Sequence, residues 1–167
     1  MSFNDAIYIK KCLGKDKKEI NIYKIRTMII GAETKLDEIA VNGLDSFGKH
    51  KNDPRITLIG AILRKYWIDE LPQICNLIKG DLKLVGIRPK NEKDWQYYPT
   101  EIMDRTLQQK PGLMAIQYAF PHTPQFKDKL KIYEDYLDLW ETDPIKTDKE
   151  YFCKIWQNIV FGGIRSC

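Results

Sequence analysis

The sequence contains no run of apolar residues long enough to cross a bilayer, and this absence limits where the chain can work. Its first residues, MSFNDAIYIKK, also lack the order of basic, apolar and small residues that marks a secretory signal peptide. We therefore expect the chain to stay in the cytoplasm.

Cysteine and histidine are scarce, which excludes several kinds of site. The cysteines lie far apart without a paired spacing, which argues against zinc binding and structural disulfides, so we interpret them as free thiols: Cys12, Cys75, Cys153 and Cys167. The two histidines, His50 and His122, cannot build a histidine-rich metal site, and a Ser-His-Asp or Cys-His triad would need one of them. Oxygen ligands and carboxylate chemistry are favoured instead.

Internal repeats, low-complexity tracts and linkers rich in proline, glycine or serine are also missing, so residues 1–167 are expected to form a single domain. The net charge of +4 arises from 27 basic and 23 acidic residues, a mild excess that suits anionic substrates or an anionic lipid surface. No reader motif for nucleic acid is recognisable, and we expect no nucleic acid partner.

The first half of the chain predicts a hairpin followed by two helices. Alternating β-branched and aromatic residues on both sides of a turn predict a β-hairpin over 6–27. The polar, glycine-containing segment 31–54 is expected to be a mobile loop. A helix should begin after Thr57, which is a good N-cap residue, and a second should run from about Pro72 to Gly80.

The second half predicts mostly helices. KLVGI is typical of a short strand, and EKDWQYY and TEIMDRTLQQ of helical pieces that lead to a turn at 110–112, which completes a helical core over 55–120. Two longer helices, 126–140 and 147–161, form the C-terminal part, 126–161. The predicted fold class is α+β, a mostly helical single domain with a small N-terminal β-hairpin.

The aromatic and aliphatic residues of these last two helices follow helical spacing. Two interpretations remain open: packing into the core, or contact of part of the helices with a bilayer surface, where Trp and Tyr favour the headgroup region. The residues concerned are Tyr133, Tyr136, Leu137, Trp140, Phe152, Ile155, Trp156, Ile159 and Val160.

Asp69 and Glu70 are the candidate catalytic residues. Acidic residues before a first-turn proline also stabilise a helix N-terminus, so capping alone would explain them. The basic residues around the motif favour chemistry, because arginine binds phosphate oxygens in pairs and a carboxylate can hold a divalent cation that neutralises a diphosphate. Arg64 belongs to this basic set.

Four stretches of the chain resemble a known family. YKIRTM at 23–28, DPRITLIGAILRK at 53–65, DELPQICNLIKGDLKLVGIRP at 69–89 and KPGLMAIQ at 110–117 follow the order and spacing of the bacterial sugar transferases, the monotopic polyprenyl-phosphate phosphoglycosyl transferases. The resemblance covers nearly the whole chain, and the run from DELPQ to RP is highly specific.

The resemblance implies transfer of a sugar 1-phosphate from a nucleoside diphosphate sugar, usually UDP-linked, to a polyprenyl phosphate at the membrane. In the mechanism of this family the aspartate of the acidic pair attacks phosphorus and carries a covalent phosphosugar, while the adjacent glutamate helps to hold Mg²⁺. These positions correspond to Asp69 and Glu70. Covalent catalysis would divide a difficult transfer into two steps, and capping and catalysis are compatible roles.

Other residues follow from the resemblance, each with a plainer alternative. Arg88 is similar to the phosphate-binding arginine of the family, although Pro89 would also make a surface arginine rigid. Lys24 and Arg26 share one face of the predicted hairpin and flank the site, or they lie on a solvated hairpin edge.

Three further candidates come from the same resemblance. Lys79 and Asp81 surround Gly80 in a turn that could be only a helix stop, while Asp81 matches the family motif and would support the acidic pair or the metal. Asp135 resembles an acidic residue near the donor site in the family, and a solvated position on a helix face is its alternative.

The sequence also departs from the family pattern. Members usually begin with a hydrophobic re-entrant helix that anchors the domain, and this chain begins almost directly at the hairpin, so we expect it to lie peripherally at the inner face of the cytoplasmic membrane, with an anchoring partner as one possibility. Ile87 replaces a proline, and Ala115 a glycine. These departures support a second hypothesis, a non-catalytic relative that acts as a partner in a glycan-assembly complex.

Overall fold

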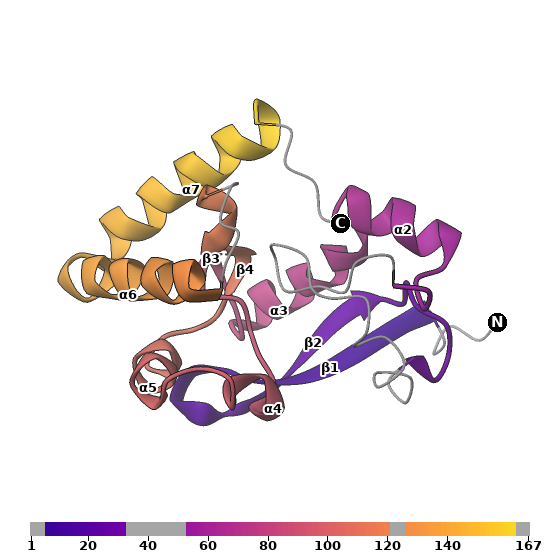
Figure 1. Cartoon of the computed structure of the whole chain (residues 1–167), viewed down its shortest axis with the longest axis horizontal. Helices are drawn as coiled ribbons and strands as arrows, with labels where there is room; N and C mark the ends of the chain where they lie inside the picture. The colour runs from indigo at the N-terminus through magenta and orange to yellow at the C-terminus, as the bar shows by residue number, and fades with distance from the viewer. Residues whose placement is uncertain (1–5, 33–52, 121–125, 163–167) are drawn as a thin grey trace.

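The computed structural model describes residues 6–32, 53–120 and 126–162. Helices dominate, and the strands form two small sheets, one of which is the N-terminal antiparallel hairpin, so the predicted α+β class is confirmed. In Figure 1, helices α6 and α7 lie on one side, the hairpin and α2 lie on the other, and strands β3 and β4 lie between them. The predicted mobile loop at 31–54 falls almost entirely outside the described residues.

The hairpin consists of β1 (Ile7–Leu13) and β2 (Glu19–Ile25), paired antiparallel from Ile7↔Ile25 to Leu13↔Glu19. A 3-10 turn, η1 (Lys15–Lys17), connects the strands. The register places Lys24 opposite Tyr8, one residue before the end of β2. From this position Lys24 reaches Glu70, which lies in the helical part of the chain that follows. The prediction of a hairpin over 6–27 is confirmed.

Helix α2 (Leu58–Lys65) begins where the sequence predicted, because the Thr57 side chain accepts a hydrogen bond from Gly60 N at 3.0 Å. The next helical segment differs from the prediction. A 3-10 helix, η4 (Ile68–Gln73), comes first, and α3 (Ile74–Lys79) follows it. Proline lacks an N–H, so Pro72 is tolerated inside this short 3-10 segment, and the α-helix starts only after it.

Gly80 ends α3 in the left-handed conformation, with φ of 78°, as predicted. The chain then enters β3 (Lys83–Gly86), passes through α4 (Glu92–Trp95) and α5 (Thr100–Leu107), and returns in β4 (Gly112–Ala115). The parallel pairing of β3 with β4 was not predicted. A Cβ atom at Gly112 would lie 2.1 Å from the backbone nitrogen of Gly86, so close approach of the two strands requires glycine there.

After a 3-10 turn, η5 (Ile116–Ala119), the chain closes with α6 (Phe126–Thr142) and α7 (Pro144–Val160). The predicted pair at 126–140 and 147–161 is confirmed, with one correction. Helix α7 starts three residues earlier, because Asp143 caps it by accepting from Lys146 N and Pro144 occupies the first turn.

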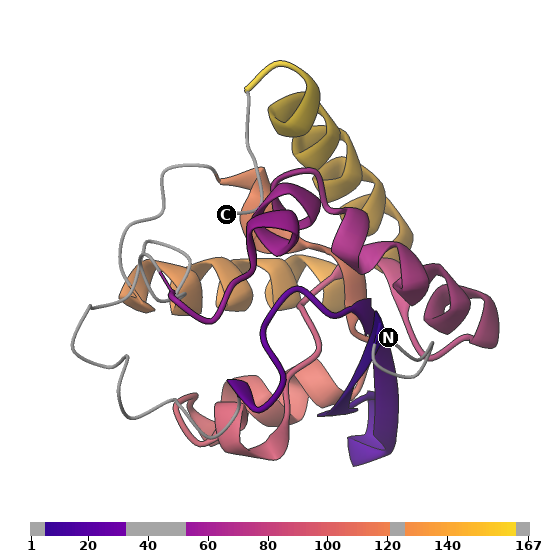
Figure 2. The ribbon, with the colours of Figure 1, turned by 90° about the vertical axis from the view of Figure 1, so that its right-hand side faces the viewer.

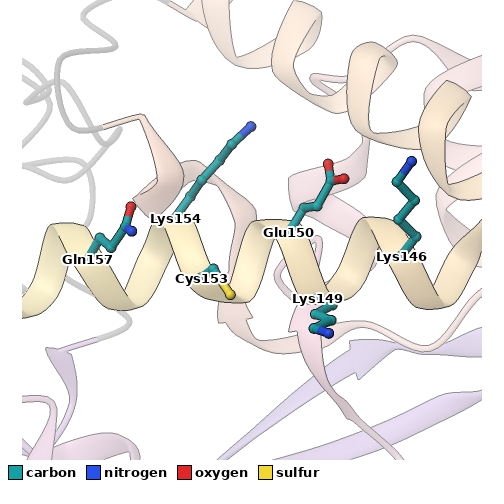
Figure 3. A pocket seen from close by; sticks show the side chains of 6 residues that line it. All are labelled: Lys146, Lys149, Glu150, Cys153, Lys154 and Gln157. Atoms are coloured by element: carbon teal, nitrogen blue, oxygen red, sulfur yellow. The ribbon is translucent and has the colours of Figure 1, made fainter.

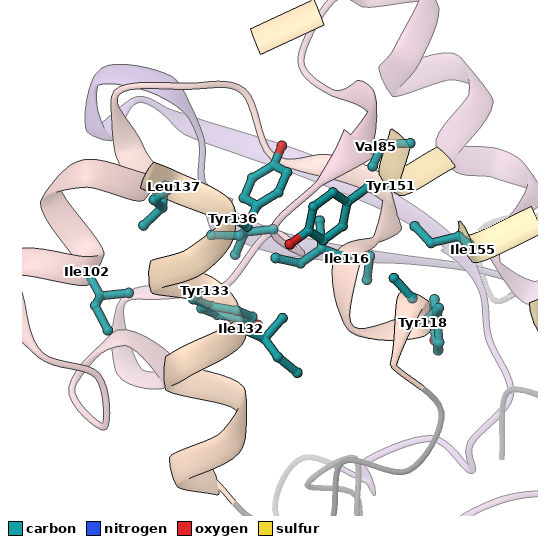
Figure 4. Close-up of a cluster of buried hydrophobic side chains, with 13 residues drawn as sticks. Val85, Ile102, Ile116, Tyr118, Ile132, Tyr133, Tyr136, Leu137, Tyr151 and Ile155 are labelled. Carbon is teal, nitrogen blue, oxygen red and sulfur yellow. The ribbon is translucent and has the colours of Figure 1, made fainter. Parts of the chain in front are cut away.

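The main core lies between α6, α7, η5 and β3 (Figure 4). It contains Val85, Ile87, Ile102, Ala115, Ile116, Tyr118, Ala119, Ile132, Tyr133, Tyr136, Leu137, Tyr151 and Ile155. Core packing is therefore the correct interpretation for Tyr133, Tyr136, Leu137 and Ile155, whereas Trp156 and Val160 are exposed.

Ile87 and Ala115, the two departures from the family pattern, are both buried in this core. Ala115 forms the last pair of the β3–β4 register with Gly86, and Ile87 follows Gly86 directly, so an alanine and an isoleucine at these positions are compatible with the parallel ladder. A smaller cluster of Cys12, Ile20, Ile22 and Leu82 joins the hairpin to the segment after α3. Within the described ranges, no helix has both the length and the apolar character that a membrane span requires.

Candidate active site

Asp69 and Glu70 lie in the first turn of η4, and both side chains are buried. Strand β2 packs against this segment, which brings Lys24 close to the acidic pair. Trp67, just before η4, has a positive φ of 56°, an unfavourable conformation for a bulky residue. Its ring meets the Tyr118 ring edge to face at 5.9 Å, so tertiary packing holds the strained entry to the acidic pair.

Glu70 is surrounded by cationic groups from two distant parts of the chain. Lys24 Nζ donates to Glu70 Oε1 at 3.1 Å, and Arg88 Nη2 donates to the same oxygen. The other amino group of Arg88 donates to the Tyr118 hydroxyl at 3.2 Å. Burial strengthens these charge-assisted hydrogen bonds, and together they fix both the carboxylate and the guanidinium.

Asp69 differs from its neighbour. Its Oδ1 atom is buried and has no hydrogen-bond partner within the part of the chain that the structure describes. Nε2 of Gln73, four residues later and also buried, lacks an acceptor among the same residues. A buried unpaired acceptor and a buried unpaired donor are both costly, so these two atoms make the η4 segment a candidate place for a ligand that would supply the missing partners.

Arg64 approaches the acidic pair from α2. Its Nε donates to the Thr27 hydroxyl at 2.8 Å. Burial lowers the pKa of its guanidinium, and the negative charges of Asp69 and Asp53 act in the opposite direction. Arg64 therefore adds positive potential on the side of Asp69.

Capping does not account for the acidic pair. Residue Trp67 caps η4 and Gln73 caps α3, and neither helix start has a side-chain cap hydrogen bond. The helix start still benefits from Asp69 and Glu70 in one way, because negative charge in a first turn interacts favourably with the helix dipole.

Lys79 and Asp81 make their contacts elsewhere. Lys79 Nζ donates to the Tyr23 hydroxyl at 3.0 Å, and this exposed hydrogen bond raises its pKa. Asp81 Oδ2 accepts from Nδ2 of the fully buried Asn76 at 3.2 Å. The Lys79 contact joins α3 to β2, and the Asp81 contact holds the turn after α3 against α3 itself, so neither residue contacts the acidic pair in these hydrogen bonds.

Arg26 and Asp135 are not joined to the acidic pair by a described contact. The Arg26 guanidinium lies 5.6 Å from the centre of the Tyr8 ring on the hairpin. Asp135 is exposed on α6, where its charge acts on the Tyr151 hydroxyl. The proposed substrate roles of both residues stay predictions.

Three residues near the acidic pair had no assigned role in the sequence: Trp67, Gln73 and Tyr118. Gln73 lies inside the DELPQ run, so its position was a usable signal. Tyr118 and Trp67 carried no signal, because an aromatic residue beside apolar neighbours predicts core packing and a positive φ at tryptophan is set by its surroundings.

A surface hollow of about 440 Å³ lies elsewhere, on the outer face of α7. Figure 3 shows that its lining side chains come from this single helix: Lys146, Lys149, Glu150, Cys153, Lys154 and Gln157. Among the described residues, no group from a second element lines this hollow, so it does not compete with the acidic pair as a site of chemistry.

The carboxylate oxygens of the acidic pair are the type of ligand atom that Mg²⁺ prefers. Magnesium is usually bound by one or two carboxylates together with substrate phosphates and water, and Asp69 and Glu70 offer two neighbouring carboxylates. Groups of three or more His, Cys, Asp or Glu with metal-binding proximity are absent from the residues described here. A metal at this place would therefore complete its coordination with substrate oxygens.

Known proteins with similar sequences share this motif-bearing region. The chain is 37% identical over 117 residues to an undecaprenyl-phosphate galactose phosphotransferase of Salmonella typhimurium, covering 66% of this chain and 24% of that protein. It is 35% identical over 116 residues to a UDP-galactose-lipid carrier transferase of Erwinia amylovora, with 66% and 24% covered. The exopolysaccharide production protein ExoY of Rhizobium meliloti is 29% identical over 150 residues, with 84% and 66% covered.

The chain thus spans about a quarter of the length of the first two of these relatives. The model of one family, bacterial sugar transferase, matches residues 2–160, and this range contains the hairpin, the acidic pair, Arg88 and both closing helices. The chain belongs to the bacterial sugar transferase family.

Proposed function

We propose that this chain transfers a sugar 1-phosphate from a nucleoside diphosphate sugar, most simply a UDP-sugar, to a polyprenyl phosphate, with Asp69 as the nucleophile. One observation carries the proposal: a buried carboxylate oxygen with no hydrogen-bond partner among the described residues lies beside a glutamate that two cations hold in place. An oxygen without a hydrogen-bond partner keeps its lone pairs for attack, while the adjacent cations attract a diphosphate.

In the first step, Asp69 Oδ1 attacks the phosphorus that bears the sugar. A new P–O bond forms to the carboxylate, and the bond to the nucleoside phosphate breaks, so the nucleoside monophosphate leaves with the electron pair. Arg88 and Lys24 supply positive charge on the Glu70 side, where negative charge develops on the phosphoryl oxygens. Gln73 Nε2 is a buried donor for one of those oxygens.

In the second step, a phosphate oxygen of the polyprenyl phosphate attacks the same phosphorus. The bond to Asp69 breaks, its carboxylate is restored, and the product is a polyprenyl diphosphate sugar. Glu70 would help to hold Mg²⁺, which when bound neutralises diphosphate charge.

The surface next to the acidic pair suits an acceptor that sits in a membrane. Helices α2 and α3, together with η4 between them, expose a set of large apolar side chains: Leu58 (90% exposed), Ile59, Ile62, Leu71, Ile74 and Ile78 (81%). In Figure 2, α2 and the hairpin face the viewer, with α6 and α7 behind them. Exposed apolar groups of this number favour contact with lipid, so we place the working chain at the inner membrane surface.

Mass spectrometry of the intact protein tests the covalent step. The chain is incubated with Mg²⁺ and a panel of UDP-sugars, starting with UDP-galactose, without acceptor. A mass gain of one sugar phosphate, together with release of UMP, is expected. The Asp69→Asn variant keeps the size of the side chain and removes its nucleophilic charge, so it should gain no mass.

Two results would count against the proposal. An adduct of equal yield in Asp69→Asn would move the nucleophile to another residue. Failure of every donor to bind or react, also with polyprenyl phosphate in lipid nanodiscs, would favour a non-catalytic partner in glycan assembly.

A further inference from the structure

Lys90 lies two residues after Arg88 and is buried, at 8% exposure. Its ammonium nitrogen is 4.6 Å from the ring centres of three aromatic residues, Trp95, Tyr98 and Tyr133. We call these three rings the aromatic box. A cation that faces several aromatic rings is attracted by each of them, and burial strengthens the attraction.

The hydrogen bonds of Lys90 connect it to Arg88, whose guanidinium contacts Glu70. Nζ donates to the Tyr133 hydroxyl at 3.2 Å and to the backbone carbonyl of Arg88 at 3.5 Å. The backbone carbonyl of Lys90 accepts from Leu13 N at 2.8 Å, which ties the segment to β1. The turn that carries Arg88 is therefore anchored on one side by the hairpin and on the other by the box.

More positive than negative groups act on the Lys90 ammonium. Asp94, the nearest acidic influence, makes its salt bridge with Lys10 at 2.9 Å, while Arg88, Lys10 and Lys129 repel the Lys90 ammonium. Burial is the main effect and lowers the pKa of Lys90 to about 7. Burial raises the pKa of both phenols, Tyr98 and Tyr133, so they stay neutral over the same pH range.

We propose that Lys90 is a positioning residue: its ammonium, held in the aromatic box, anchors the backbone of Arg88 so that the guanidinium stays between Glu70 and Tyr118. The proposal rests on the transferase function in one respect, namely that Arg88 binds the donor phosphate. Lys90 itself touches neither Glu70 nor Asp69 in the described contacts. Loss of its proton removes the attraction to the rings and weakens the anchor.

The expected sign of the pH dependence follows from these contacts. The anchor is present below pH 7 and is lost as the pH rises through the pKa of Lys90, so kcat/KM should fall on the alkaline side with a midpoint near 7. Stability should change in the opposite direction. Unfolded Lys90 keeps its proton up to its ordinary pKa, so the free energy of unfolding rises with pH above about 7. A fall in activity without a fall in stability separates positioning from unfolding.

The test compares Lys90→Met and Lys90→Arg with the natural chain. We expect Lys90→Met to lower kcat/KM about tenfold at pH 6.5 and to abolish the alkaline fall, since it has no proton to lose. Lys90→Arg keeps a permanent cation and should restore part of the activity with no fall near pH 7. An alkaline fall of unchanged midpoint in Lys90→Met would overturn the proposal.

A second readout does not depend on turnover. The ¹⁵N resonance of Arg88 Nε, assigned by its loss in Arg88→Lys, should titrate near pH 7 in the natural chain and be constant in Lys90→Met. Lys83 offers a matched control. Burial also lowers its pKa, and its ammonium faces two aromatic rings, but it donates hydrogen bonds to Asp148 and not to the Arg88 carbonyl. Lys83→Met should leave the Arg88 titration unchanged.

The two readouts distinguish the two claims. If the Arg88 resonance titrates with Lys90 but no donor reacts, the positioning role holds and the transferase function fails. If donors react and the Arg88 resonance is indifferent to Lys90, the positioning role is wrong and the transferase function holds.

Discussion

Single residues of the signature run divide into two kinds, those that face the ligand space and those that hold the run in place. Asp69 has a buried oxygen that finds no partner in the described part of the chain, whereas Asn76, in the same run, hydrogen-bonds through both ends of its amide. Asn76 Oδ1 accepts from Tyr23 N, and its Nδ2 donates to Asn21 O and to Asp81 Oδ2. Membership of a signature therefore does not by itself identify a catalytic group.

Asn76→Ala is expected to lower the free energy of unfolding by about 3 kcal/mol, because the fully buried amide loses its hydrogen bonds to Tyr23 N, Asn21 O and Asp81 Oδ2. Urea denaturation measures the loss. At a temperature where the variant is fully folded, the rate of adduct formation should be near that of the natural chain. Asn158→Ala, which removes a single hydrogen bond to Tyr118 O, is the matched control and should cost about 1 kcal/mol. A folded but inactive Asn76→Ala would assign Asn76 to the chemistry.

At the scale of elements, helix caps decide where the site lies along the chain. The Thr57 cap sets the start of α2, and its hydroxyl also reaches Thr27 O at 3.2 Å, which ties α2 to the end of the hairpin. Gly60, in the first turn, leaves no space for a side chain, since a Cβ atom would lie 2.1 Å from Thr27 O. These contacts place Arg64, in the last turn of α2, beside Thr27 and near Asp69.

Thr57→Ala should lower the free energy of unfolding by about 1 kcal/mol, because the N–H of Gly60 loses its acceptor. Thermal or urea denaturation provides the measurement. Thr100→Ala serves as the control, since Thr100 opens α5, where no side-chain cap hydrogen bond is present. Equal losses in the two variants would show that the cap is not the source of the effect.

At the scale of the whole molecule, several large apolar side chains lie outside the core, and one group of them gathers on the helices beside the acidic pair. Helices α6 and α7 bury Tyr133, Tyr136 and Tyr151 in the core with η5 and β3, whereas Trp156 is exposed. Helix α2 instead presents Leu58, Ile59 and Ile62 outward, and α3 presents Ile74 and Ile78. The membrane-facing surface that we propose lies on α2 and α3, because these helices expose their apolar residues next to the acidic pair, where a lipid-bound acceptor must react.

The double variant Leu58→Ser/Ile62→Ser should reduce binding to vesicles of phosphatidylglycerol and phosphatidylethanolamine by about tenfold or more, because two apolar side chains no longer enter the lipid. Co-sedimentation measures the change. Ile145→Ser removes an equally exposed apolar residue from the start of α7, at 84% exposure, and should bind as the natural chain does. Equal binding by the double variant and the natural chain would contradict this placement of the membrane.

The sequence by itself determined the local features. The spacing of apolar residues, the Thr57 cap and the Gly80 stop predicted the hairpin and most helices, because these signals act within a few residues. The signature run identified the family and the acidic pair. The start of α7 was missed by three residues, although Asp143 and Pro144 are a local signal, and the 3-10 form of η4 depends on Pro72 and on packing against β2.

Only the tertiary structure decided which of the basic residues meet the acidic pair. Lys24 and Arg88 reach Glu70 across 46 and 18 residues of chain, while Lys79 and Asp81, closer in sequence to Glu70 than Arg88 is, bind Tyr23 and Asn76 instead. The pairing of β3 with β4, the positive φ of Trp67 and the burial of Lys90 in an aromatic box likewise depend on contacts between distant segments. Local propensity carries no information about such contacts, because they are made only when the chain packs.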